Sequence, residues 1–162
     1  MCGIIGYIGG KSAVPILMSG LSRLEYRGYD SAGVAVLSGG EIDIVKAKGR
    51  LAILEEKLKS YKSDACMGIG HTRWATHGEP NDVNSHPHMS GNGEIAVVHN
   101  GIIENYIQLK EFLIGKGFRF KSETDTEVVA HLIEYNYKGD LVKAVMNTIN
   151  DIEGAYALGV IC

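Results

Sequence analysis

The order of short apolar runs and amphipathic stretches along the chain limits the possible folds more than any other feature. Apolar runs at 32–37 and 41–49 are joined by Gly39-Gly40, a pair that favours a tight hairpin turn. Residues 11–26 instead carry apolar side chains at the spacing of one buried helix face. Because hairpins alternate with amphipathic helices, we expect an α+β fold in which helices cover antiparallel sheets.

The same reasoning assigns the rest of the chain. The expected helices are 11–26, 50–60, 105–115, 125–137 and 140–151. The expected strands are 2–9, 32–37, 41–49, 66–74, 118–121 and 154–162, with a second hairpin in 94–105 about Asn100-Gly101. The proline, asparagine, aspartate and glycine content of 76–93 predicts a long loop without regular structure.

Composition excludes several classes of protein. At 162 residues the chain is long enough for one domain, and its net charge of −3 gives no indication of nucleic-acid binding. No segment has the pattern of a signal peptide, and no apolar run is long enough to span a membrane. The three cysteines are odd in number and far apart, which favours a reducing compartment. We therefore expect a cytoplasmic protein that binds neither nucleic acid nor membranes.

Cys2 directly follows the initiator methionine. If Met1 is removed, the α-amine of Cys2 lies beside its own thiol, and one residue supplies both a nucleophile and a base. A free α-amine has a pKa of about 7.7–8.0, which suits it to take a proton from the thiol and return it to a leaving amine. The alternative is that Cys2 is a small buried residue opening a strand, and the dipeptide alone favours that alternative.

Five of the six histidines fall within 29 residues, so a metal site has to be considered for His71, His77, His86, His88 and His99. Zinc sites favour close pairs such as H-x3–5-H, anchored on a hairpin or helix. His71 and His77 are separated by a strand exit, and His86-Pro87-His88 lies in a loop without a nearby cysteine or carboxylate pair. We therefore expect no metal, and nothing else in the chain indicates a cofactor.

The segment 71–78 places several polar side chains where a strand ends, namely Arg73, Trp74, Thr76 and His77. Binding groups concentrate at strand ends and in the loops that follow them. Arg73 could hold a carboxylate through two parallel hydrogen bonds, a geometry that lysine does not offer. The alternative, and by itself the more common case, is a surface arginine in a salt bridge.

Two further motifs each allow a structural and a chemical interpretation. Asn100-Gly101 is the preferred dipeptide of a type I′ hairpin turn, and it also offers a side-chain amide and an adjoining N–H to one oxyanion. Thr124 and Glu127 fit a capping box for the following helix, with Asp125 in its first turn. Asp125 could instead face a substrate ammonium, although local rules favour the cap.

Taken together and in order, five motifs closely resemble the glutaminase domains of the glucosamine-6-phosphate synthase family: Cys2-Gly3-Ile4, RLEYRGYDSAG (23–33), HTRWATHGEP (71–80), HNGIIEN (99–105) and SETDTE (122–127). Members of this family are isomerising glutamine–fructose-6-phosphate aminotransferases, and their glutaminase domains are class II glutamine amidotransferases with an N-terminal nucleophile fold. Amidophosphoribosyltransferases resemble the chain less, since they differ where it has EYRGYDSAG (25–33). The resemblance implies a four-layer αββα sandwich of antiparallel sheets.

The resemblance also implies a catalytic mechanism. Cys2 would attack the side-chain carboxamide of L-glutamine while its α-amine relays the proton. The Asn100 side chain and the Gly101 N–H would hold the oxyanion. Ammonia would leave, and water would hydrolyse the γ-glutamyl thioester to glutamate.

The remaining residue roles are likewise implied by the resemblance. The substrate α-carboxylate would be held by Arg73 with Thr76 and His77. Asp125 would hold the α-ammonium, and Trp74 would belong to the same substrate site. Arg27 would support the N-terminal cysteine, and the 73–80 loop would close over bound glutamine.

In this family the glutaminase domain is longer than 162 residues, and a sugar isomerase domain follows it. We therefore expect 1–162 to be a C-terminally incomplete glutaminase domain without its isomerase domain. Fructose 6-phosphate would be reached only through that absent domain, and the full-length protein would be a homodimer. The alternative is a catalytically silent, glutaminase-like binding fragment, inactive because Met1 is retained or because the domain is truncated.

Overall fold

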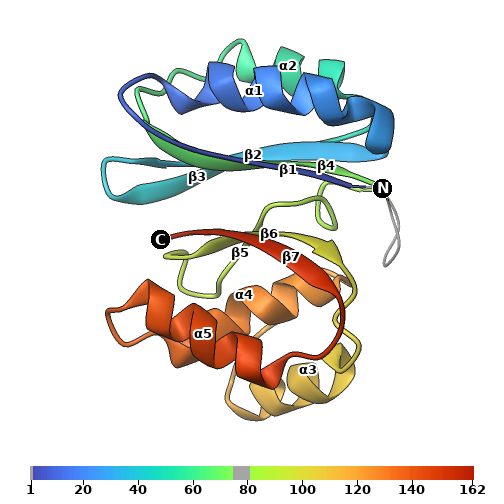
Figure 1. Ribbon diagram of the computed structural model, residues 1–162, viewed down its shortest axis with the longest axis vertical. Coiled ribbons are helices and arrows are strands. Elements are labelled where there is room, and N and C mark those ends of the chain that lie inside the picture. The colour runs from blue at the N-terminus through green and yellow to red at the C-terminus, as the bar shows by residue number, and fades with distance from the viewer. Residues whose placement is uncertain (1, 75–80) are drawn as a thin grey trace.

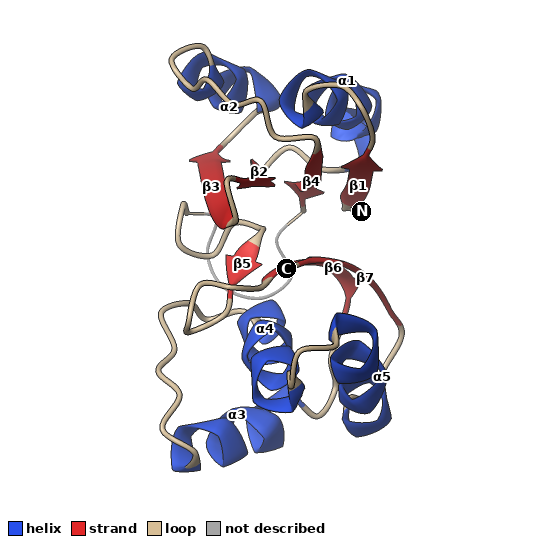
Figure 2. Ribbon diagram, turned by 90° about the vertical axis from the view of Figure 1, so that its left-hand side faces the viewer, coloured by secondary structure: helices blue, strands red, loops and turns tan. Residues whose placement is uncertain are grey.

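The computed structural model describes residues 2–74 and 81–162, which form four layers (Figure 1). Two antiparallel sheets lie face to face in the centre. The outer face of one is covered by α1 (Ala13–Leu24) and α2 (Leu51–Leu58), and that of the other by α4 (Asp125–Asn136) and α5 (Leu141–Asp151), while α3 (Tyr106–Gly115) packs against α4. Figure 2 shows the same layers after a quarter turn. The α+β fold and its αββα layering are confirmed.

The first sheet has the strand order β1-β4-β2-β3. Its strands are β1 (Gly3–Ile8), β2 (Ser31–Ser38), β3 (Glu41–Lys48) and β4 (Met67–Arg73). Gly39 and Gly40 have φ angles of 61° and 88°, which the tight turn between β2 and β3 requires, so the expected hairpin is confirmed. Gly3 pairs with Thr72, and this register places Cys2 beside the end of β4.

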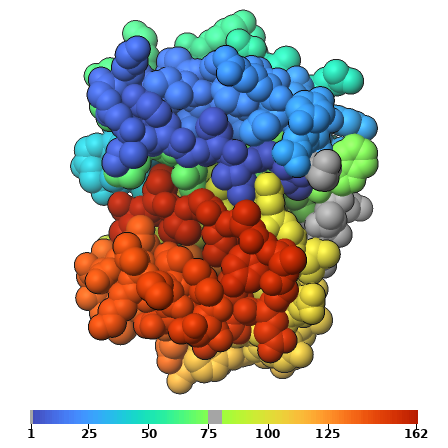
Figure 3. Space-filling model, in the orientation of Figure 1, coloured from blue at the N-terminus to red at the C-terminus, as the bar shows by residue number. Residues whose placement is uncertain are grey.

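The second sheet has the strand order β5-β6-β7 and is antiparallel throughout. Its strands are β5 (His88–Met89), β6 (Ala96–Gly101) and β7 (Tyr156–Ile161). Small and branched side chains fill the space between the two sheets, including Ala35, Ile69, Ala96, Val98 and Ile161. Figure 3 shows the N-terminal layers, in blue, packed against the C-terminal layers, in orange and red.

The expected hairpin about Asn100-Gly101 is wrong. β6 runs through both residues, and its last pairs with β7 are Asn100 with Ala157 and Gly101 with Tyr156. The dipeptide favours a turn locally, but pairing with a strand more than fifty residues later extends β6 past it. The loop expected over 76–93 also contains a short strand, β5, which pairs with β6.

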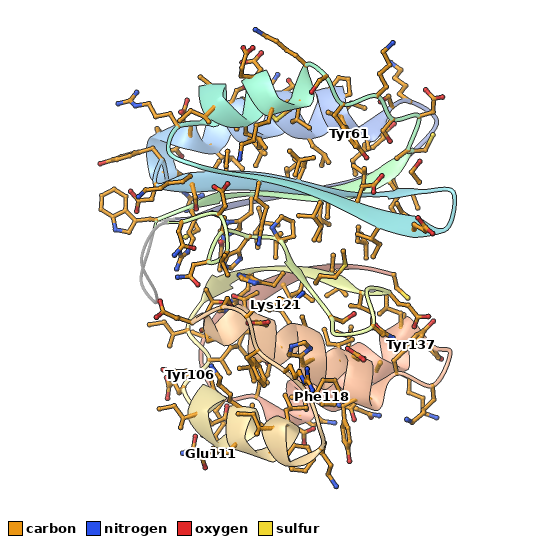
Figure 4. The ribbon with its side chains drawn as sticks, turned by 180° about the vertical axis from the view of Figure 1, so that it is seen from behind. Tyr61, Tyr106, Glu111, Phe118, Lys121 and Tyr137 are labelled. Carbon is orange, nitrogen blue, oxygen red and sulfur yellow. The ribbon has the colours of Figure 1, made fainter. Side chains whose placement is uncertain are left out.

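The strand expected at 118–121 is also absent from the described residues. This segment, which carries Phe118 and Lys121 in Figure 4, connects α3 to α4. The Phe118 N–H donates to the Leu113 carbonyl oxygen at 3.0 Å, and the Lys121 N–H donates to Glu127 Oε1 at 2.8 Å. The segment's backbone is thus bonded by a helix end and a carboxylate rather than by a neighbouring strand.

No helix in the described part of the chain has the length and apolar character needed to cross a membrane.

Candidate active site

A cavity of about 420 Å³ lies between the start of β1, the ends of β4 and β6 and the first turn of α4. The residues that line it are Cys2, Arg27, Arg73, Trp74, His86, His99, Asn100, Gly101, Ile102, Thr124 and Asp125. Seven of the nine predicted site residues therefore meet in one place. The other two, Thr76 and His77, lie outside the described residues, as does most of the 73–80 loop.

The Cys2 thiol is held at the end of β4. The Trp74 N–H donates to Cys2 Sγ at 3.2 Å, and the Cys2 thiol donates to the Trp74 carbonyl oxygen at 3.4 Å. A side chain at Gly3 would place its Cβ 2.8 Å from Leu24 Cβ, so glycine allows β1 to begin close against α1. Cys2 is only partly buried, and it lines the cavity.

Asn100 and Gly101 lie next to Cys2 across the gap between the sheets. Asn100 Nδ2 donates to the Cys2 carbonyl oxygen at 3.2 Å, while Asn100 Oδ1 lies 2.9 Å from His71 Nε2. Gly101 has a φ angle of +112°, and a Cβ there would meet the Ala155 carbonyl oxygen at 2.1 Å. Glycine is therefore required at this position, because any side chain would clash with the neighbouring backbone.

A cation and an anion line the same cavity. Arg73 and Asp125 are 3% and 5% exposed, which excludes the surface-arginine interpretation. Burial lowers the pKa of Arg73, while nearby Cys2, Asp125 and Asp30 act to raise it. Asp125 Oδ2 accepts a hydrogen bond from the Ile103 N–H at 3.0 Å. Two fixed and opposite charges suit a zwitterionic ligand better than an ion of either sign.

The first turn of α4 is compatible with both interpretations of the segment that contains Thr124, Asp125 and Glu127, as a helix cap and as part of a binding site. Thr124 Oγ1 accepts from the Glu127 N–H at 3.4 Å and so caps the helix. The Glu127 carboxylate accepts from the Lys121 and Ser122 N–H groups instead of returning to Thr124. Burial acts to raise the pKa of Glu127, but hydrogen bonds from His131, Ser122 and Lys121 lower it to about 2. The cap is therefore present, and Asp125 is left to face the cavity.

Sequence reasoning missed two features of the clustered histidines: His71, His86, His88 and His99 pack against one another, and His86 and His99 line the cavity. The His71 and His86 rings stack with centroids 4.2 Å apart, and His99 Nδ1 lies 3.0 Å from Thr126 Oγ1. Burial lowers the pKa of His71 to about 4 and of His88 to about 3. Their crowding in the sequence was the signal, although it had been weighed only as a metal site, against which the spacing argued. Within 2–74 and 81–162, no group of three or more histidine, cysteine or acidic side chains is placed to hold one.

A larger cavity of about 1100 Å³ lies elsewhere, beside β5 and the segment between α3 and α4. Lys46, Asp82, Lys121 and His131 are among its lining residues. None of the predicted site residues lines it. The smaller cavity is therefore the candidate active site.

Comparison with known proteins points to one family. The sequence profile of the glutamine amidotransferase domain matches residues 56–161. Among curated proteins, those from Caldanaerobacter subterraneus subsp. tengcongensis and Clostridium tetani are each 64% identical over 162 residues, and that from Aquifex aeolicus is 58% identical over 163. All three are named glutamine–fructose-6-phosphate aminotransferase (isomerizing). The matches cover 99–100% of this chain, which spans about a quarter (27%) of each relative's length.

Two solved structures are similar over nearly the whole chain. One is a glutamine phosphoribosylpyrophosphate amidotransferase from B. subtilis complexed with ADP and GMP, with a TM-score of 0.85 and 30% identity. The other is described as the allosteric regulatory enzyme of purine biosynthesis, with a TM-score of 0.87 and 31% identity. Each match covers 99% of this chain and 35% of the other.

Proposed function

The chain belongs to the glutamine amidotransferase domain family, and from this we propose that it hydrolyses L-glutamine to glutamate and ammonia at the Cys2 cavity. The observation that carries the proposal is the meeting of Cys2, Asn100, Arg73 and Asp125 around one space of about 420 Å³. The cavity thus offers a nucleophile and a hydrogen-bond donor for an oxyanion, and it also offers a cation and an anion that can bind the two charged groups of an amino acid.

The chemistry begins at the Cys2 sulfur. With Met1 removed, the free α-amine takes the thiol proton, and the sulfur forms a bond to the carbon of the glutamine carboxamide. The Asn100 Nδ2 amide and the Gly101 N–H hold the negative charge that develops on the carbonyl oxygen. The protonated α-amine of Cys2 then returns its proton to the leaving nitrogen, and ammonia departs as the C–N bond breaks.

Hydrolysis of the γ-glutamyl thioester completes the cycle. The α-amine of Cys2, which is uncharged again, takes a proton from water as the water oxygen bonds to the thioester carbon. The C–S bond breaks, glutamate leaves and the thiol recovers its proton. Arg27 lines the cavity beside Cys2, where it supports the N-terminal residue.

The charged ends of glutamine explain the two buried charges. Arg73 binds the α-carboxylate through paired hydrogen bonds, and Thr76 and His77 contribute to the same end of the substrate. Asp125 binds the α-ammonium. Trp74, whose backbone already contacts the Cys2 sulfur, closes the side of the substrate site.

The names of the relatives extend the proposal beyond this chain. They describe aminotransferases that act on fructose 6-phosphate. The ammonia would therefore be supplied to that sugar phosphate, bound by an isomerase domain in a longer protein. We place that protein in the cytoplasm as a homodimer.

Replacement of Cys2 tests the proposal. The chain with Met1 removed should release glutamate from glutamine, and Cys2→Ala should lose at least about 10³ of that rate because no thioester forms. Cys66→Ser is the matched control, since Cys66 is exposed and outside the cavity, and it should keep the parent rate. Equal rates for Cys2→Ala and the parent would overturn the proposal. A parent with Met1 removed that releases no glutamate would favour the silent-fragment alternative.

A further inference from the structure

A buried histidine outside the cavity contacts one side chain inside it. His71 lies on β4 and is 1% exposed, and it does not line the cavity. Its Nε2 atom lies 2.9 Å from Asn100 Oδ1 and 3.0 Å from the His99 carbonyl oxygen. His71 therefore links the first sheet to the end of β6 in the second.

The partners of His71 decide which of its nitrogens carries the proton. The His99 carbonyl oxygen can only accept a hydrogen bond, so Nε2 must be the donor. Burial also disfavours a second proton on the ring and lowers the pKa of His71 to about 4. At neutral pH the ring is therefore uncharged, with its hydrogen on Nε2 and none on Nδ1.

The same hydrogen decides the orientation of the Asn100 amide. An N–H group at His71 Nε2 attracts the amide oxygen and repels the amide NH₂. With Oδ1 held there, Nδ2 must point the other way, toward Cys2, where it donates to the Cys2 carbonyl oxygen at 3.2 Å. A flipped amide would present an oxygen to the site of the oxyanion and repel it.

The His71 ring is itself held in place. His86 stacks on it with an interplanar angle of 16°, and the His99 N–H donates to His86 Nδ1 at 3.3 Å. Gly33 is paired with His71, and a Cβ at Gly33 would meet the His86 carbonyl oxygen at 2.2 Å. Glycine thus lets the 86–88 segment approach the sheet closely enough for the two rings to stack.

We infer that His71 is a positioning residue that fixes the Asn100 amide with its NH₂ group toward the oxyanion. The inference rests on the proposed glutaminase function and adds to it a residue that never touches the substrate. If this inference is right, the rate of amide hydrolysis depends on whether the side chain at position 71 is long enough for its N–H to reach Asn100 Oδ1, and a polar side chain alone is not sufficient.

Two substitutions of similar polarity separate reach from polarity. Glutamine carries its amide nitrogen about where histidine carries Nε2, whereas the shorter asparagine cannot reach Asn100. His71→Asn should lower kcat for glutamine by about 10–100-fold with KM within about threefold, because the oxyanion donor is misplaced only in the transition state. His71→Gln should stay within about fivefold of the parent. His131→Asn, which removes a buried histidine bonded to the Arg119 carbonyl oxygen outside the cavity, should leave kcat unchanged.

Two further readouts distinguish positioning from a general structural role. Alkylation of Cys2 by iodoacetamide displaces iodide as the S–C bond forms and creates no oxyanion, so its rate should be the same in His71→Asn and the parent. In an Asn100→Ala background, His71→Asn should cost less than about twofold, because the group it positions is gone.

The outcomes separate this inference from the proposed function. Equal losses in His71→Gln and His71→Asn, no loss in His71→Asn, or an undiminished loss in the Asn100→Ala background would overturn the inference while the parent remains active. ¹⁵N NMR of the imidazole ring tests it without turnover. Hydrogen on Nε2 is expected at pH 7, and hydrogen on Nδ1 would overturn the inference. A parent that keeps the Nε2–H form but releases no glutamate would contradict the proposed function instead.

Discussion

Lowering the pH from 7 to 5 should strongly destabilise the chain, because the histidines buried between the sheets must remain uncharged. Burial lowers the pKa of His71 to about 4 and of His88 to about 3, against about 6.5 for a histidine in an unfolded chain. At pH 5 both rings are protonated when the chain is unfolded and neutral when it is folded. The unfolded state then binds more protons, so stability falls as the pH falls.

The size of the loss follows from these pKa values. One pKa unit corresponds to about 1.36 kcal/mol, and pH 5 lies about 1.5 units below the unfolded value. Each histidine therefore costs about 2 kcal/mol between pH 7 and pH 5, and the pair about 4 kcal/mol, out of the 5–15 kcal/mol typical of a domain. Below pH 5 the free energy of unfolding continues to fall until about pH 4 for His71 and about pH 3 for His88, where each ring also becomes protonated in the folded state. Glu127, with its pKa lowered to about 2, adds a loss only below about pH 4.5.

Urea unfolding followed by circular dichroism at pH 7, 6 and 5 measures this effect. His88→Gln is the informative variant, because it removes one titrating group that does not line the cavity. Its stability should fall by about 2 kcal/mol less than that of the parent over the same pH range. A parent that loses less than about 1 kcal/mol, or a variant that shows the full parental loss, would refute the reasoning.

Three substitutions at the cavity give further predictions. Asn100→Ala should lower kcat for glutamine by about 10²–10³ with little change in KM; a change confined to KM in steady-state assays of glutamate release would contradict its role at the oxyanion. Arg73→Lys should reduce kcat/KM by about tenfold or more, mainly through KM, because lysine offers no paired hydrogen bonds; an unchanged KM would argue against binding of the α-carboxylate there. Gly101→Ala should destabilise the fold by about 2 kcal/mol or more, because its φ angle is +112° and its Cβ would lie 2.1 Å from the Ala155 carbonyl oxygen; an unchanged urea midpoint would disprove this.

The sequence predicted much of the fold because local patterns were strong. The Gly39-Gly40 hairpin and the apolar face of 11–26 follow rules of turn geometry and helical spacing, and both are present in the structure. The motif resemblance is confirmed by relatives that are up to 64% identical over the whole chain. The layering of the two sheets followed from that resemblance rather than from periodicity.

The errors arose where distant contacts decide the structure. The Asn100-Gly101 dipeptide favours a turn, but β7 arrives from residues 156–161 and pairs with it as a strand. The 118–121 segment has the composition of a strand, but within 2–74 and 81–162 it pairs with no strand, and its last N–H donates to the Glu127 carboxylate instead. Neither partner can be identified from the nearby sequence, because local propensity does not determine tertiary pairing.

Seven of the residues that line the candidate site were predicted from the sequence, but the contacts that hold them in place were not. The motifs that contain Cys2, Arg73, Asn100 and Asp125 are far apart in the chain, and the fold brings these residues to one cavity. Nothing in the sequence indicated that His71 would bond to the Asn100 side chain. The spacing of the clustered histidines argued against a metal site, but it did not indicate that their rings pack together as uncharged groups.

Labelling of the N-terminal cysteine tests the account of Cys2 most directly. The chain with Met1 removed is treated with the glutamine analogue 6-diazo-5-oxo-L-norleucine, and intact mass and peptide mapping then locate the adduct. We predict a single adduct on the Cys2 sulfur that forms in step with the loss of glutamate release, and none on a form that retains Met1, whose α-amine is not at Cys2. An active chain that is inactivated without an adduct on Cys2, or with its adduct on Cys66 or Cys162, would contradict the account.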